Sequence, residues 1–325
     1  MINFNRKKKP NSKFGNILIT SSSKKIPLID NVIKSKNLID ENIKIFAGDN
    51  NHNVISKFFV DKFWKMPKTI DANYTQILKK LLDQNIKIII PTRDGELNFW
   101  SKHKKKLNKK GIIVIVNDIK KINICNDKVK FNKFCIVNNI LTPRIYNTNS
   151  KENQKLIIKE RFDSTSLITN NISSKNYKKY LVNYINPFIQ KYIPGKEISV
   201  DIWSDKKNIK NYFISRYREL VIDGESHITK GFENKVLNRI IDKVIYKLKL
   251  HGPYMLQFIQ SKDKFYLIEC NPRVGGASTY SINNGLDIIL WSLIDAYKIE
   301  KKFLIKYKKK KTFNRLVRAP FDNFR

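Results

Sequence analysis

Residues 252–285 read GPYMLQFIQSKDKFYLIECNPRVGGASTYSINNG, and this stretch decides the fold. Its two apolar runs, residues 254–260 and 264–270, are rich in aliphatic and aromatic side chains. Residues 261–263 between them are polar and form a turn signal, so the pattern predicts a β-hairpin. Because side chains alternate between the two faces of a strand, we expect the polar residues of both runs to gather on one face.

The pairing of this hairpin determines which polar side chains meet. If Gln260 pairs with Lys264, Gln257 lies opposite Leu267 and diagonal to Glu269. Gln257 and Glu269 then point to the same side of the hairpin. We therefore expect a polar site on this face.

Glu269 lies in an otherwise apolar or small run, YLIEC. A carboxylate buried there needs a cation or a hydrogen-bond network. Mg²⁺ takes one or two oxygens from a protein and the rest from phosphate and water, and Asn271 offers a second oxygen on the same face. Arg273 adds a planar positive fork suited to phosphate oxygens. Spacing alone leaves a second interpretation open, an ion pair between Glu269 and Arg273 that closes a β-bulge.

The first 120 residues alternate short apolar runs with longer helical stretches, a pattern typical of parallel βαβ units. Their continuous apolar, β-branched composition predicts strands that are buried on both faces. The predicted strands are 16–20, 43–47, 86–90 and 112–116. Three serines at 21–23 follow the first strand where a dinucleotide-binding fold carries GxGxxG, which argues against a nicotinamide enzyme.

The rest of the chain mixes helical and strand patterns. Helices are predicted at 126–139, entered through Asp127, and at 284–297. Strands are predicted at 155–159, 188–193 and 197–203. Residues 211–234 show no regular pattern, so we expect irregular segments there that select the substrates. The basic tail at 306–311 is interpreted as a solvated charge run.

The charge of the chain is strongly positive. A formal net charge of +36 over 325 residues would suit an anionic partner such as nucleic acid. Nearly all of the excess is Lys, which is spread along the whole chain together with abundant Asn and Ile. Arg, which base-reading and phosphate-clamping surfaces favour, is scarce. We therefore favour a compositional bias and do not expect nucleic acid as a partner.

Cysteine spacing and hydropathy bear on the compartment. Cys125, Cys135 and Cys270 have no CxxC spacing, which argues against a zinc site or a disulfide framework. The apolar run after the basic N-terminus is too short for a signal-peptide core. Residues 286–293 form the best membrane candidate, but they fall far short of the roughly 20 apolar residues that a span needs. We expect a cytoplasmic protein with no membrane partner.

Gln257 followed by residues 269–273, ECNPR, resembles the C-terminal metal-binding motif of ATP-grasp enzymes. Gly275-Gly276 and Ser278 follow it as in the branch similar to the carbamoyl-phosphate synthase large subunit. Other phrases resemble the same branch, in family order. They are 91–97 (PTRDGEL), 125–128 (CNDK), 157–162 (IIKERF) and 190–193 (QKYI).

The resemblance implies a fold that combines α/β and α+β parts. It places a Rossmann-like parallel sheet at 1–120, a small ATP-grasp lobe at 121–195, and a large lobe with the metal site and a basic tail at 196–325. Contacts with ATP are implied at Lys128, Lys159, Arg161, Gln190, Lys191, Ile193 and Glu197. Mg²⁺ or Mn²⁺ is implied at Gln257, Glu269 and Asn271, and catalysis at Asn271 and Arg273. Substrate contacts are implied at Asp94, Glu96, Arg216 and Arg218.

The resemblance implies that the protein is a carboxylate–amine ligase that uses ATP and small-molecule substrates. A homodimer is also compatible with the family. Carboxyphosphate or carbamate chemistry, as in carbamoyl-phosphate synthase, is an alternative. A degenerate ATP-binding protein is another, because residues 160–166, ERFDSTS, lack the glycines whose amides normally approach phosphate closely. Asp163 in this stretch adds repulsion.

Overall fold

The computed structural model describes residues 12–71, 73–146, 155–162, 172–173, 181, 184–207, 209–300 and 314–319. The chain divides into two compact units, each described here by itself. The first unit comprises residues 1–92, 103–115 and 289–305. The second comprises residues 93–102, 116–288 and 306–325. No helix in the described residues is long and apolar enough to span a membrane.

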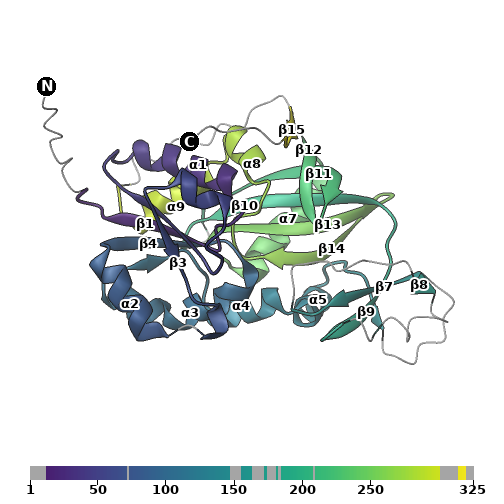
Figure 1. The fold of residues 1–325 in the computed structure, drawn as a ribbon. Coiled ribbons are helices and arrows are strands. Elements are labelled where there is room, and N and C mark those ends of the chain that lie inside the picture. The colour runs from purple at the N-terminus through teal and green to yellow at the C-terminus, as the bar shows by residue number, and fades with distance from the viewer. Residues whose placement is uncertain are drawn as a thin grey trace, which may run out of the picture. The chain divides into compact units, whose positions relative to one another are not determined.

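The first unit contains a parallel five-stranded sheet in the order β3-β2-β1-β4-β5. The strands are β1 (Asn16–Thr20), β2 (Ile45–Asp49), β3 (Lys62–Lys65), β4 (Ile86–Pro91) and β5 (Ile113–Val114). Figure 1 shows α1 (Ile26–Asn37) and α2 (Tyr74–Asp83) on opposite faces of this sheet. The predicted parallel sheet is confirmed. The prediction missed β3, because this short edge strand, KFWK, buries only Trp64.

The second unit contains an antiparallel six-stranded sheet in the order β14-β13-β10-β11-β12-β15 (Figure 1). The strands are β10 (Lys196–Ser204), β11 (Asn211–Ile222), β12 (Glu225–Phe232), β13 (Gly252–Ser261), β14 (Lys264–Asn271) and β15 (Arg315–Val317). The expectation of irregular segments at 211–234 is therefore wrong. Both faces of β11 are partly buried and one carries arginines, so the strand shows little apolar–polar alternation.

One face of this sheet carries the core of the second unit. Alternate residues of β10, Ile198, Val200 and Ile202, are fully buried on that face. They belong to one cluster with the apolar face of α7 (Lys235–Leu248), which Asn234 caps through its side chain. The same cluster includes residues of α4 (Ile119–Asn126) and α5 (Lys128–Val137). The opposite face of the sheet is therefore left for polar side chains.

The hairpin of β13 and β14 has a different register from the predicted one. Ser261 pairs with Lys264, and a β-bulge in β14 then shifts the pairing. As a result Gln257 lies directly opposite Glu269 instead of diagonal to it. A bulge sets two residues of one strand against one residue of the other, and simple alternation cannot predict it.

The remaining described elements are a small sheet and several helices. A four-stranded antiparallel sheet has the order β6-β9-β7-β8. Its strands are β6 (Ile145–Tyr146), β7 (Lys155–Glu160), β8 (Ile172–Ser173) and β9 (Pro187–Lys191). The helix predicted at 284–297 is present as α9 (Ile288–Ala296). A short helix, α8 (Thr279–Asn283), precedes it, and Gly285, whose φ is 96°, lies between the two. Further helical elements are η1 (Ile55–Phe59), η2 (Thr69–Asp71) and α3 (Asp94–Lys109).

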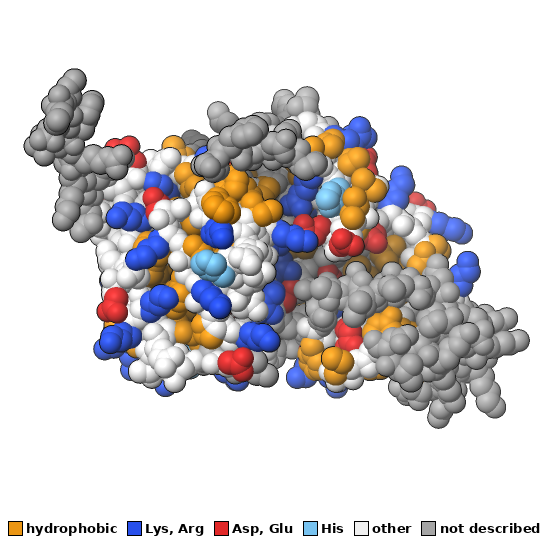
Figure 2. Space-filling model, in the orientation of Figure 1, with side chains coloured by type: hydrophobic (Ala, Val, Ile, Leu, Met, Phe, Trp, Pro, Cys, Tyr) orange, Lys and Arg blue, Asp and Glu red, His pale blue; other side chains and the backbone are white. Residues whose placement is uncertain are grey.

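Lys and Arg side chains are scattered over the visible face of the molecule (Figure 2). They do not gather into a single basic patch on that face.

Candidate active site

Five polar side chains line the face of the six-stranded sheet that lies opposite the core. Glu197 comes from β10, Arg218 from β11, Gln257 from β13, and Glu269 and Asn271 from β14. Their positions follow from the alternation of each strand, because at least one chain neighbour of each belongs to or packs against the core cluster on the other face. These neighbours are Ile198, Tyr217, Leu256, Phe258 and Cys270. The sheet thus assembles five residues that the sequence predicted to be functional.

These side chains form a continuous chain of contacts. Glu197 pairs with the Arg218 guanidinium at 2.9 Å. Arg218 also donates to the Gln257 amide oxygen at 2.7 Å. The Gln257 amide nitrogen donates in turn to Oε1 of Glu269, and the same oxygen accepts from Asn271 Nδ2 at 3.1 Å. One Glu269 oxygen therefore receives both amides.

Two lysines act on Glu269 through their charge. Burial by itself would raise the pKa of Glu269, but Lys128 and Lys159 lower it overall. Burial lowers the pKa of the Lys159 ammonium, and Glu269 and Glu197 partly counter that effect. Lys159, on β7, donates to the Gln190 side-chain oxygen at 3.2 Å. Lys128, Lys159 and Glu269 therefore lie close enough in the second unit for their charges to interact.

Lys128 is the first residue of α5, and its ammonium donates to the Glu160 carbonyl at 3.0 Å. Arg161 forms a two-bonded ion pair with Asp127, with both N–O distances 2.8 Å. Asp127 also caps α5 by accepting from the amides at its first turn. Arg161 therefore fixes the start of the helix that carries Lys128.

The residues predicted to receive adenine lie on or just after β9. Gln190 is buried and donates to the Pro143 carbonyl at 3.2 Å. The backbone amide of Lys191 donates to the Arg144 carbonyl at 2.8 Å. Ile193 is also buried.

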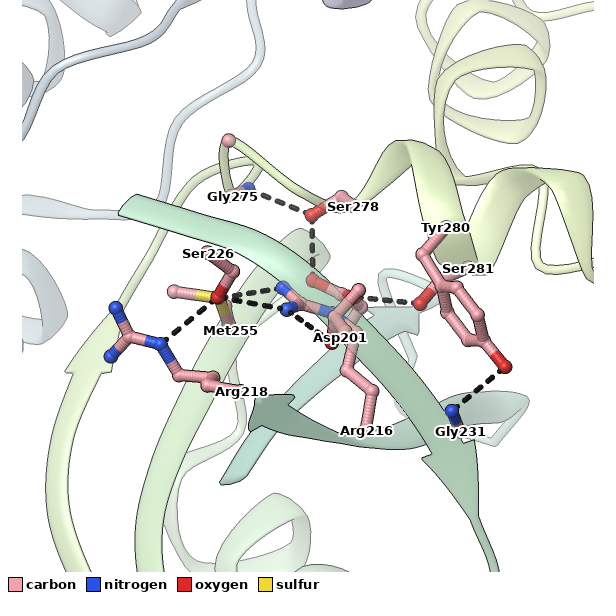
Figure 3. Close-up of polar contacts among 12 residues, drawn as sticks. Asp201, Arg216, Arg218, Ser226, Gly231, Met255, Gly275, Ser278, Tyr280 and Ser281 are labelled. Carbon is pink, nitrogen blue, oxygen red and sulfur yellow. Dashed lines mark hydrogen bonds and ion pairs between the residues drawn. The ribbon is translucent and has the colours of Figure 1, made fainter. Parts of the chain in front are cut away.

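Arg216 is placed differently from the other predicted residues, because it is only 1% exposed. Its guanidinium donates to Asp201 at 2.9 Å. Figure 3 shows that Ser278 and Ser281 are also directed at Asp201, and both hydroxyls donate to it at 2.6 Å. Ser278 accepts in turn from the backbone amide of Gly275 at 2.9 Å. This cluster holds the loop that follows the ECNPR motif.

Sequence reasoning missed Asp201 as the partner of Arg216, and it missed the hydrogen bonds that Ser278 and Ser281 donate to Asp201. A signal was present for Asp201, because Glu197, Ser199 and Asp201 share one face at period two in the predicted strand. The family motif included Ser278 but gave it no partner, and no signal marked Ser281; both contacts join residues far apart in the chain.

Asp94 and Glu96 lie at the start of α3. Asp94 pairs with Arg273. Glu96 accepts from the Arg93 backbone amide at 3.1 Å and from the Trp100 indole at 3.0 Å. Arg273 thus has a carboxylate partner, and that partner is Asp94 and not Glu269. Within the described residues, the alternative of a Glu269–Arg273 ion pair is not formed.

The donor set of this face suits a divalent cation together with phosphate. Among the described residues, no hydrogen-bond donor reaches Glu269 Oε2 or Asn271 Oδ1, so both oxygens are open. One carboxylate and one amide oxygen are the hard ligands that Mg²⁺ takes from proteins when phosphate completes its shell. Lys128 and Lys159 supply positive charge for such phosphate. The glycine-free loop at Asp163 to Ser166 and the basic tail at 306–311 lie outside the described residues.

Two family descriptions match separate parts of the chain. Residues 186–315 match a family described as ATP-grasp in the biosynthetic pathway with Ter operon. Residues 17–115 match the PylC-like N-terminal domain. A carbamoyl-phosphate synthase of Methanobrevibacter smithii is 22% identical, over 73% of this chain and 70% of its own length.

Solved structures share the fold. The L-amino acid ligase of Bacillus licheniformis has a TM-score of 0.70 at 16% identity, covering 91% of this chain and 77% of its own. The biotin carboxylase domain of Hydrogenobacter thermophilus 2-oxoglutarate carboxylase, a dimer solved with MgADP and bicarbonate, also scores 0.70, at 15% identity. That match covers 91% of this chain and 71% of the other. Residues 186–315, which carry the Gln257–Arg273 motif, thus match an ATP-grasp family, and the chain shares the fold of these solved ligase and carboxylase structures.

Proposed function

We propose that this protein is an ATP- and Mg²⁺-dependent ligase that activates a carboxylate as an acyl phosphate and joins it to an amine. The observation that carries the proposal is the state of Glu269. Its Oε1 accepts from two amides, its Oε2 receives no donor from the part of the chain that the structure describes, and two lysines act on it electrostatically. Such a carboxylate can bind a metal ion that is also bound by phosphate.

Bound Mg²⁺ would supply charge neutralisation between phosphate oxygens, and Glu269 and Asn271 would hold it. Lys128 and Lys159 would bind the phosphates, and Glu197 would accept from ribose hydroxyls. Gln190 and the backbone of Lys191 and Ile193 would hold adenine at β9.

The chemistry then requires two displacements. A carboxylate oxygen of the substrate forms a bond to the γ-phosphorus of ATP while the bond to ADP breaks. The amine nitrogen next forms a bond to the acyl carbon, phosphate leaves with its oxygen, and the nitrogen loses a proton. Arg273, held by Asp94, would stabilise the negative charge of the transferring group. No protein nucleophile is needed.

Two predicted substrate contacts receive other roles in this proposal. Arg216 would position the loop at Gly275 through Asp201 and Ser278. Glu96 would fix the first turn of α3, because both of its oxygens accept from that turn or its flank.

Phosphate release from Mg-ATP, measured across a panel of carboxylates and amino acids, tests the proposal. We expect stimulation by one carboxylate–amine pair, and loss of that stimulation in Glu269→Ala. Asp263→Asn, in the exposed turn of the same hairpin, is the matched control that retains it. Nucleotide binding without turnover under any pair would instead favour a degenerate ATP-binding protein.

A second candidate activity is carboxyphosphate or carbamate chemistry. The observation that favours it is the similarity to a carbamoyl-phosphate synthase over 73% of this chain. Phosphate release that depends on bicarbonate, and not on an organic carboxylate, would identify this activity.

The setting of the protein is also a proposal. Use of ATP and three buried free cysteines favour a reducing, cytoplasmic compartment. A homodimer is proposed from the dimer recorded for the Hydrogenobacter thermophilus domain. Light scattering of the purified chain tests it.

A further inference from the structure

Gln257 bridges two groups of opposite hydrogen-bonding character. On one side the Arg218 guanidinium is donor-only, and on the other the Glu269 carboxylate is acceptor-only. Only one orientation of an amide satisfies both neighbours: its oxygen faces Arg218 and its nitrogen faces Glu269. Turning the amide over would set N–H against a guanidinium and oxygen against a carboxylate.

Arg218 is itself fixed, so it can impose this orientation. Its Nε donates to Ser226 at 3.0 Å and its Nη2 to the Gly224 carbonyl at 2.6 Å. Its Nη1 contacts both Glu197 and Gln257. The side chain is only 9% exposed. All three nitrogens are engaged, and the planar fork cannot rotate without breaking several contacts.

Asn271 provides a contrast within the same site. Both amides donate their nitrogen to Oε1 of Glu269. The Gln257 oxygen is occupied by Arg218, whereas no donor among the described residues reaches the Asn271 oxygen. The two amides therefore differ in what they can offer to a cation.

We propose that Arg218 is a positioning residue that holds Gln257 as a hydrogen-bond donor to Glu269 and so keeps the Gln257 oxygen out of the metal's ligand set. The inference rests on the proposed function, because it concerns the same metal site. Glu269 and Asn271 are then the protein ligands, and Gln257 orients Glu269. This differs from the role of Gln257 as a ligand that the sequence motif implies.

Electron–nuclear double resonance of bound Mn²⁺ tests this assignment. The chain is produced with glutamine labelled with ¹³C at Cδ and loaded with Mn-ADP. A carbonyl carbon whose oxygen binds the metal gives a strong ¹³C coupling. We expect no such coupling in the unmodified chain, its appearance in Arg218→Met, and its loss when Gln257→Met is added. Ligand-strength coupling in the unmodified chain, or none in Arg218→Met, would overturn the proposal.

A second measurement needs no metal, so it separates this inference from the proposed function. Thermal unfolding of Arg218→Met, Gln257→Met and the double variant forms a cycle. If Arg218 clamps Gln257, the melting temperature of the double variant falls by clearly less than the sum of the two single losses. Arg218→Met combined with Asp263→Asn is the control pair, and its losses should add. Additive losses in the Arg218–Gln257 cycle would contradict the clamp, whereas a failure to bind Mn²⁺ would count against the ligase alone.

Discussion

Two carboxylates, Asp201 and Glu269, lie on the same face of one sheet, but their oxygens are used differently. Asp201 is fully buried, and both oxygens accept strong hydrogen bonds, from Arg216, Ser278 and Ser281. Glu269 receives only amide donors, both on Oε1, and the nearby cations act on it without a direct ion pair among the described residues.

The way in which its oxygens are used distinguishes a structural carboxylate from a binding carboxylate, whereas the residue type alone does not. A buried carboxylate with both oxygens and its charge satisfied has nothing left to offer a ligand. A carboxylate with an open oxygen, close to lysines, has capacity for a cation that carries its own anions. The first arrangement stabilises the loop after the ECNPR motif, and the second is suited to bind.

The largest effect is expected from Glu269→Gln. The change removes the charge of the side chain but keeps its shape. Loss of a residue that only supports a metal ligand costs roughly 10- to 100-fold. Because Glu269 is proposed to bind the metal directly, we expect catalytic efficiency to fall by more than this. Steady-state phosphate release measures this loss. The melting temperature should fall less than in Asp201→Ala, because no ion pair within the described residues depends on Glu269 and only its attraction to the nearby cations is lost. Retained activity with a large fall in melting temperature would reverse the assigned roles.

Asp201→Ala should show the opposite behaviour. Removing one partner of a buried ion pair leaves the Arg216 guanidinium buried without its counter-ion, and such losses cost about 3–5 kcal/mol of unfolding free energy. Urea unfolding followed by circular dichroism measures this loss.

Ser281→Ala removes only one donor to Asp201 and should cost less unfolding free energy, about 1.5–3 kcal/mol, which is typical of a hydrogen bond to a charged group. Equal losses in both variants would show that Asp201 does not depend on Arg216.

Much of this comparison was accessible from the sequence. Glu269, a carboxylate in an apolar run, and Asn271 two residues later required only strand alternation and the chemistry of buried charge. The parallel sheet of the first unit followed from continuous β-branched runs. Asp127 as the start of α5 followed from its capping side chain.

The rest depended on contacts that a local pattern does not contain. The bulge in β14 changed the partner of Gln257, and alternation alone predicted a diagonal pair. Arg216 and Arg218 are two residues apart on one face of β11, yet Arg216 meets Asp201 and Arg218 meets Gln257. The family resemblance implied one role for both arginines, because it does not show which side chains of the neighbouring strands each of them meets.

The smallest expected effect is a dependence on pH that distinguishes the surroundings of Glu269 from those of Asp201. Asp201 has an arginine partner, and arginine side chains do not lose their proton in proteins. The surroundings of Glu269 include Lys159, whose pKa is lowered by burial from that of an ordinary lysine, although Glu269 and Glu197 partly oppose the shift. As pH rises, Lys159 therefore loses its proton earlier than a solvated lysine, and the attraction for phosphate falls with it.

We expect kcat/KM for ATP to decline on the alkaline side with an apparent pKa below the usual lysine value. Lys159→Arg should remove this decline, while the unfolding free energy that depends on Asp201 and Arg216 should show no matching alkaline step. The same alkaline decline in Lys159→Arg would assign it to another group and leave the two carboxylates alike in their response to pH.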